Sequence, residues 1–140
     1  MKADLITPER INELTRFLPL FDKPDRQFIV GWAGGTEKSG GPSTGSYPLY
    51  PPDVEAFFRL ASQPWWCDYQ YQPVQAGAML EDDEVIQSAS IEQIKTMLTF
   101  CVRGERFCYG HWEAVLKSGR ILALLRRLEV LQAELSNQVS

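Results

Sequence analysis

Apolar residues recur every three or four positions in four stretches of the chain, and this period predicts amphipathic helices. Two of these stretches also carry helix-start signals. Thr7 before Pro8 can cap the first helix, and Ser90 with Gln93 three positions later has the spacing of a capping box. The apolar positions of the four stretches are Ile11, Leu14, Phe17 and Leu18; Val54, Phe57, Phe58 and Ala61; Ile91, Ile94, Met97, Leu98 and Cys101; and Ile121, Leu124, Leu128, Leu131 and Leu135.

Between these stretches the pattern is shorter and less regular. Residues 27–32 predict a strand, residues 64–72 a strand or an extended crossing, and residues 73–80 a short helix. Residues 33–46 are rich in glycine and small polar residues, which predicts a flexible loop. The expected fold is mainly α, with five to six helices and one or two short strands. It forms a single compact domain of α+β type over residues 1–140.

The last helix is the most regular element, and its apolar stripe narrows along its length. Extra leucines widen the stripe near its start, as in a helix that packs into its own domain. Leu128, Leu131 and Leu135 form a narrower leucine seam, which is typical of helix–helix contacts. We therefore expect the seam to contact a protein partner, or a second copy of the chain in a homodimer. Residues 136–140 are expected to form a frayed tail.

Composition and charge narrow the class of protein. Of 140 residues, 44% are hydrophobic and 23% are charged, as in ordinary globular domains. The net charge of −4 gives no field that would attract nucleic acid or membranes, and no apolar run approaches a membrane span. The N-terminus lacks the apolar region of a secretion signal, and three cysteines suggest reduced thiols. We therefore expect a cytoplasmic protein.

The segment 103–112, which reads RGERFCYGHW, concentrates the residue types of an active site or a metal site. Its Cys108 and His111 could join Cys101 and Cys67 as metal ligands, but structural zinc sites bring their ligands in pairs on tight turns. A reactive pair of Cys108 and His111 would lack an orienting group and an oxyanion hole. We therefore predict no metal, no cofactor and no catalytic residue.

Three further patterns bear on binding chemistry. Lys38 follows Glu37 rather than glycine, so the glycine-rich loop is not a phosphate-binding loop of the Walker type. The acidic run 81–84 lacks the spacing of a calcium loop and is expected to be solvated. Basic residues gather late in the chain near Phe107 and Tyr109, which could stack on bases, but the acidic net charge argues against a nucleic-acid partner.

Three motifs follow one another along the chain: W-x-G-G at 32–35, Y-P-x-Y at 47–50 and E-R-F-x-x-G at 105–110. The last is followed by a helix rich in leucine and arginine. In this order they resemble a small bacterial family that is catalogued only as a domain of unknown function, from about Phe17 to about Leu131. The glycine-rich loop departs from that family in length and composition. The resemblance implies one compact domain of bacterial or phage origin, and it implies no activity.

We interpret the motif residues as a packed corner between helices rather than an active site. Arg106 is expected to be buried with Asp68 as its ionic partner, because a buried guanidinium needs a carboxylate or a carbonyl. Phe107 is expected to be buried beside it, and Gly110 to let two helices approach closely. The other members of this network are Trp32, Tyr47, Tyr50 and His111.

Two functional hypotheses follow. The first is a non-catalytic protein-interaction module that binds a host protein complex, as small acidic anti-defence proteins such as anti-CRISPRs do. Its interaction surface would combine Trp65 and Trp66 with the leucine seam, since tryptophan is enriched in binding hot spots. The alternative is a ligand-binding or enzymatic domain with a pocket around Tyr47, Tyr50, Arg106 and His111.

Overall fold

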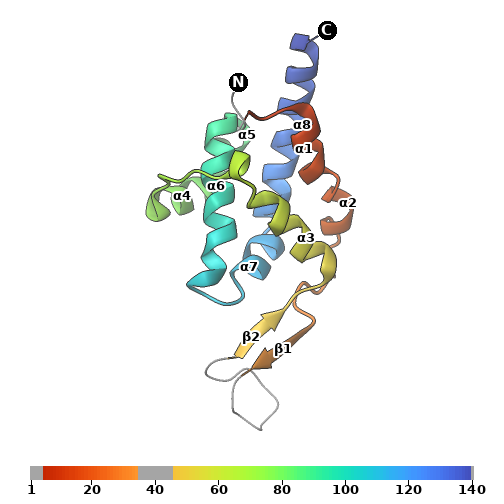
Figure 1. Ribbon diagram of the computed structural model, residues 1–140, viewed down its shortest axis with the longest axis vertical. Helices are drawn as coiled ribbons and strands as arrows, with labels where there is room; N and C mark the ends of the chain where they lie inside the picture. The colour runs from red at the N-terminus through yellow and green to blue at the C-terminus, as the bar shows by residue number, and fades with distance from the viewer. Residues whose placement is uncertain (1–4, 35–45, 140) are drawn as a thin grey trace.

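Three of the four periodic stretches each form one helix, and shorter helices and a β-hairpin complete the fold (Figure 1). The first stretch is divided, because its helix ends at Thr15 and Leu18 begins a second, short helix. The computed structural model describes residues 5–34 and 46–139. The prediction of a mainly helical single domain with short strands is confirmed within these residues, and α2 and α5 are short helices that were not predicted. In chain order the elements are α1 (Pro8–Thr15), α2 (Leu18–Phe21), β1 (Gly31–Gly34), β2 (Ser46–Leu49), α3 (Pro52–Ala61), η1 (Pro64–Trp66), α4 (Pro73–Leu80), α5 (Asp83–Gln87), α6 (Ile91–Arg103), η2 (Gly104–Arg106), α7 (His111–Lys117) and α8 (Arg120–Val139).

The predicted helix starts are confirmed by hydrogen bonds. The Thr7 hydroxyl accepts a hydrogen bond from the Arg10 amide at 3.3 Å at the start of α1. At the start of α6 the Gln93 amide donates to the Ser90 hydroxyl at 3.2 Å, and the Ser90 amide donates to the Gln93 side chain at 2.9 Å. These bonds satisfy amides that have no partner inside the helix, which is why local sequence fixes both boundaries.

The core of the domain lies where α1, α2, α5, α6 and α7 pack on the long helix α8, and α3 joins it by packing against α1 and α6 (Figure 1). The apolar faces predicted for α3 and α6 pack into this core. Phenylalanines join the first two helices to α3. The ring centroid of Phe57 lies 5.5 Å from that of Phe17 and 5.2 Å from that of Phe21, both in edge-to-face geometry. One continuous apolar core therefore positions every helix that carries a candidate site residue.

The leucine seam of α8 is covered by α1, so the expectation that it is free for a partner is wrong for two of its three residues. Leu128 is fully buried, Leu131 is 9% exposed, and Leu135 is half-buried against the same core. The Gln132 side chain donates to the Pro8 carbonyl at 3.0 Å, which holds α1 in place. α8 continues to Val139 where a frayed tail was expected.

The hairpin of β1 and β2 projects from the helical body, at the end of the molecule opposite to the C-terminal end of α8 (Figure 1). Its strands are antiparallel, with Trp32 opposite Pro48 and Ala33 opposite Tyr47. The first strand begins four residues later than the predicted 27–32. The expected loop 33–46 contributes its ends to the hairpin, and the rest of it lies outside the described residues. The alternating segment 64–72 contains the 3-10 helix η1 rather than a strand.

None of the helices described in residues 5–34 and 46–139 combines the length and the apolar composition that crossing a membrane requires.

Candidate functional site

The centre of the RGERFCYGHW segment is the carboxylate of Glu105, in η2. Its Oε1 accepts the Tyr50 hydroxyl at 2.9 Å and the Trp112 amide at 2.8 Å, and its Oε2 accepts the Gly110 amide at 2.9 Å. These bonds join the end of β2, the turn after η2 and the start of α7. We call residues 104–110 the Phe107 loop, after its most exposed member. Glu105 fixes the conformation of this loop from inside.

The start of helix α7 needs a hydrogen-bond acceptor, and the carboxylate of Glu105 supplies it. Gly110 is the residue that caps α7; its φ of 92° lies in the left-handed region that favours glycine, and it has no side chain to accept from the helix amides. Glu105 accepts from two amides at this helix start, where a negative charge is also favoured by the helix dipole. Gly110 is therefore required for its backbone conformation. The expectation that it allows a close helix approach is wrong, because an added Cβ would meet nothing within 4 Å.

Aromatic rings pack behind this carboxylate. Trp112 stacks on Phe58 with ring centroids 4.3 Å apart and planes 4° apart, and Tyr50 lies 5.1 Å from Trp112. The Trp112 indole donates to the Val102 carbonyl at 3.1 Å. Burial, the hydrogen bond to Glu105 and its negative charge all raise the pKa of Tyr50, so its hydroxyl stays protonated as a donor. Burial also raises the pKa of the Cys101 thiol, which keeps it neutral in the core.

His111 lies on the other side of the loop, against Gly104 and Phe100. Its ring meets the Phe100 ring edge to face at 5.1 Å, and a Cβ added at Gly104 would overlap the imidazole. The imidazole Nε2 is buried without a hydrogen-bond partner among the described residues. Burial lowers the pKa of His111; Glu105 and a hydrogen bond with the Phe100 carbonyl oppose this without reversing it. His111 is thus a packed, neutral ring.

The structure corrects the predicted roles of Arg106 and Phe107. Phe107 is 83% exposed rather than buried, and Arg106 is exposed as well. Asp68 does not pair with Arg106; its carboxylate accepts the Thr96 hydroxyl at 2.7 Å and the Gln70 amide at 3.0 Å. The turn that ends at the left-handed Gly110 directs residues 106–109 to solvent, so the buried polar residue of this motif is Glu105.

The predicted pocket is not formed, because its members lie in different places. Tyr47 is 46% exposed on the hairpin. Trp32, which was expected in the same network, is 41% exposed and belongs to the adjacent pair of the ladder, so the two side chains point to opposite faces. Tyr50 is buried at the Glu105 carboxylate, and His111 is at Gly104. Of the four proposed pocket residues, Arg106 is the one that lines the groove described below.

The tryptophans proposed for an interaction surface also differ from expectation. Trp66 is fully buried, so it cannot be part of a surface. Trp65 is half-buried, and the guanidinium of Arg10 lies 3.9 Å from its ring centroid. Both side chains are therefore used inside the domain, where η1 packs against α6.

The cysteines and acidic residues are dispersed. Cys101 is buried, Cys67 is half-buried and Cys108 is exposed, and the described part of the chain contains no group of three residues arranged to hold a metal ion. In the acidic run 81–84, two carboxylates contact Arg120: Glu81 at 3.1 Å and Asp83 at 3.0 Å. Two of the four acidic residues of this run therefore form ion pairs with α8.

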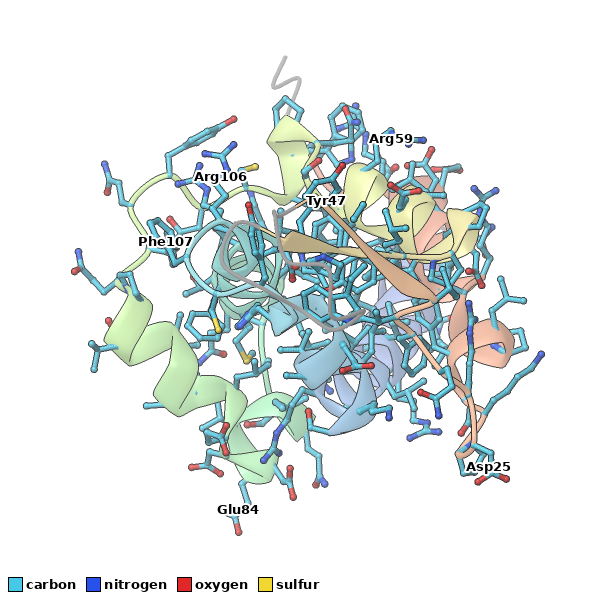
Figure 2. All side chains as sticks on the ribbon, turned by 90° about the horizontal axis from the view of Figure 1, so that it is seen from below. Asp25, Tyr47, Arg59, Glu84, Arg106 and Phe107 are labelled. Carbon is cyan, nitrogen blue, oxygen red and sulfur yellow. The ribbon has the colours of Figure 1, made fainter. Side chains whose placement is uncertain are left out.

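A surface of aromatic and arginine side chains surrounds the Phe107 loop. It consists of Tyr69, Arg103, Arg106, Phe107 and Tyr109, and we call it the aromatic–arginine surface. The guanidinium of Arg103 lies 6.0 Å from the ring centroid of Tyr69, which joins the segment after η1 to the end of α6. Figure 2 shows Arg106 and Phe107 at the upper left of the molecule, with the acidic Asp25 across it at the lower right.

Beside this surface lies an open groove of about 670 Å³ between α3 and the α6–α7 connection, which we call the α3–α6 groove. Phe58, Val102 and Trp112 form its apolar floor. Its polar lining consists of Glu55, Arg59, Ser62, Glu105, Arg106 and Tyr109.

The protein is thus a small helical domain whose candidate site is an exposed loop, held by hydrogen bonds to Glu105, beside an open groove. A family model described as a family of unknown function, DUF6508, matches residues 6–134, and the chain belongs to this family. Comparison with curated proteins and with solved structures gives no match. Family membership carries no activity, so the function is inferred from the geometry of the site.

Proposed function

We propose that the protein is a non-catalytic interaction module of bacterial or phage origin, which acts in the cytoplasm by binding a protein partner through the aromatic–arginine surface. The observation that carries this proposal is Phe107, which is 83% exposed on a loop held by three hydrogen bonds to Glu105. A phenylalanine exposed to this extent loses contact with water when a partner covers it, and this favours association.

The composition of the surface supports a protein partner. Tyrosine, arginine and other aromatic residues are enriched in the centres of protein interfaces. Tyr69 and Tyr109 are 66% and 56% exposed. Tyr109 lies two positions after Phe107 on the same loop, and Tyr69 is joined to the end of α6 through the guanidinium of Arg103. The hydrogen bonds to Glu105 order the loop before a partner arrives, so binding removes less conformational entropy and more of the contact energy contributes to affinity.

The charge of the surface indicates the partner's chemistry. Arg106 makes no ion pair within residues 5–34 and 46–139, and Arg103 contacts aromatic rings rather than carboxylates. Two of the late basic residues that could have served nucleic acid are engaged elsewhere, since Arg120 pairs with Glu81 and Arg126 with Asp22. A protein that offers an apolar recess edged by carboxylates is the complement of this surface. A host protein complex is the partner to test first, as for small anti-defence proteins.

The test places a photoreactive benzophenone side chain at position 107 and, in a control protein, at position 130. Val130 is 48% exposed on α8, away from the aromatic–arginine surface. Each protein is irradiated in bacterial lysate, and the cross-linked protein is identified and purified. We expect a protein that cross-links at 107 and not at 130. Its affinity for Phe107→Ala should be at least about 30-fold weaker than for the parent, as for a binding hot spot.

The proposal is contradicted if both positions cross-link the same set of proteins, or if the purified partner binds Phe107→Ala as tightly as the parent. Val130→Ala is the matched control in the binding measurement and should retain the parent's affinity. A substrate-like small molecule that raises the melting temperature, with no protein cross-linked at 107, would instead favour the ligand-binding alternative.

A further inference from the structure

The α3–α6 groove has an apolar floor with a guanidinium on each side. Arg59 comes from α3 and Arg106 from η2, and Figure 2 shows both on the same side of the molecule. The floor between them includes Val102 and the stacked rings of Phe58 and Trp112. A groove of about 670 Å³ is large enough for a few amino-acid residues.

The hydrogen-bonding groups of the lining are not equally available. Glu105 already accepts three hydrogen bonds, and the Trp112 indole donates to a carbonyl. Ser62 donates its hydroxyl to the Arg59 carbonyl at 2.8 Å. Neither guanidinium takes part in an ion pair in the described part of the chain. The donors left for a ligand are therefore mainly the two arginines.

Two carboxylates in the lining oppose an anionic ligand, those of Glu55 and Glu105. The charge of Glu105 is directed to its three hydrogen-bond donors, so Glu55 is the one that can be removed without disturbing the loop. It is exposed on α3, one helical turn before Arg59, and its carboxylate lines the same groove. The two side chains are not within ion-pair distance in the structure, but their spacing allows them to approach. Glu55 should therefore weaken the binding of an acid at Arg59, and its removal should strengthen it. Tighter binding after removal of Glu55 is expected only if the ligand is an anion.

We propose that the α3–α6 groove binds an acidic segment of the protein partner, with a carboxylate between Arg59 and Arg106 and an apolar side chain on the floor. This inference rests on the proposed function and specifies what the partner presents. A planar guanidinium can hold a carboxylate through two parallel hydrogen bonds, and the neighbouring aromatic floor strengthens them by excluding water.

The test uses four-residue peptides, acetylated and amidated so that side chains alone carry charge. One reads Glu-Leu-Phe-Glu, and its matched control reads Gln-Leu-Phe-Gln. Binding is followed by the NMR shifts of the Trp112 indole and the Ser62 amide, which report on the groove floor and edge. We expect saturable shifts with the acidic peptide and at least about tenfold weaker binding of the control, as for loss of a charge-assisted hydrogen bond.

Two substitutions in the groove should change the affinity for the acidic peptide in opposite directions. Arg106→Gln should weaken the acidic peptide at least about tenfold, whereas Glu55→Gln should strengthen it a few-fold. Both residues are exposed, so both variants should keep the parent's melting temperature. Equal binding of the two peptides, or no change with Arg106→Gln, would overturn the proposal. Tighter binding of phenylacetate than of the peptide would also overturn it, because the groove would then take a free small carboxylate.

The two proposals fail separately. Phe107 does not line the groove, so Phe107→Ala should leave peptide binding unchanged even though it weakens the partner. Suppose that a protein cross-links at position 107 but the acidic peptide does not bind in the groove. This result contradicts only the further inference. Peptide binding without any cross-linked protein contradicts the proposed function and, with it, the assignment of the peptide to a partner.

Discussion

The Tyr50 hydroxyl donates to the Glu105 carboxylate at 2.9 Å, although 55 positions of sequence separate the two residues. Tyr50 follows β2 and is 8% exposed, and Glu105 lies between α6 and α7. The contact ties the base of the hairpin to the loop that presents Phe107. The stability of the loop and the position of the hairpin are therefore coupled through one hydrogen bond.

Tyr50→Phe should destabilise the domain by about 1–2 kcal/mol, because it removes a buried hydroxyl from a carboxylate and leaves the ring packing in place. Urea denaturation measures the free energy of unfolding. Tyr47→Phe is the matched control, since Tyr47 is 46% exposed and should change stability by less than about 0.5 kcal/mol. Combined with Glu105→Gln, Tyr50→Phe should show a coupling energy near 1 kcal/mol. Strict additivity of the two variants would contradict the direct contact.

Phe107→Ala should leave the free energy of unfolding within about 0.5 kcal/mol of the parent, because the ring is 83% exposed. Phe58→Ala is the contrasting variant. Phe58 is 1% exposed and stacks on Trp112, so its truncation should cost about 3–5 kcal/mol. Thermal denaturation of both variants and the parent measures the two losses of stability. A large loss of stability for Phe107→Ala would restore the buried corner expected from sequence.

Gly104→Ala should destabilise the domain by about 1–3 kcal/mol through overlap with the His111 ring. Its φ of −59° suits any residue, so the backbone itself opposes no substitution. Gly77→Ala, inside α4, is the control: its new methyl would lie 3.4 Å from the Phe100 ring and should be neutral or slightly stabilising. His111→Ala in the same chain should recover the stability lost by Gly104→Ala. Failure of this rescue would mean that the ring is not the obstacle.

Stability should fall as the pH is lowered from about 7.5 to 5.5, through protonation of His111. Burial lowers the pKa of His111 in the folded state, so the unfolded chain binds this proton first, near its ordinary value of about 6.5. The contribution is complete above that value and is lost as the pH falls toward the lowered pKa. Asp53, whose pKa is lowered mainly by Arg26, titrates well below this window. Urea denaturation at several pH values should show a shallower slope for His111→Asn than for the parent; equal slopes would assign the effect to other groups.

The helices and the core could be predicted from sequence because their cause is local. A period of 3.6 residues places apolar side chains on one face, and caps such as Ser90 with Gln93 lie within one turn of the helix they start. The leucine seam was also recognised as a helix–helix contact. Spacing alone did not reveal that its partner is α1 of the same chain.

The candidate site was harder to predict because its cause is not local. Glu105 contacts amides five and seven positions ahead, a spacing outside the capping box, and a hydroxyl 55 positions behind. The one available signal was Gly110, because a helix capped by glycine needs an acceptor from elsewhere. Phe107 was placed in the core because an aromatic residue in a motif is usually buried. The direction of the turn, which depends on Gly110, decides otherwise.

The packing of α1 on α8 has a consequence for how the chain is made. The Pro8 carbonyl accepts its hydrogen bond from Gln132, 124 positions later, and Leu128 and Leu131 are covered by α1. During synthesis the N-terminal helix therefore leaves the ribosome long before the surface that buries it exists. α3 emerges earlier and contacts α1, but the part of α1 that packs on α8 stays exposed until nearly all of α8 has been made. Folding is therefore completed late, and a chaperone that shields α1 during translation should raise the yield of folded protein.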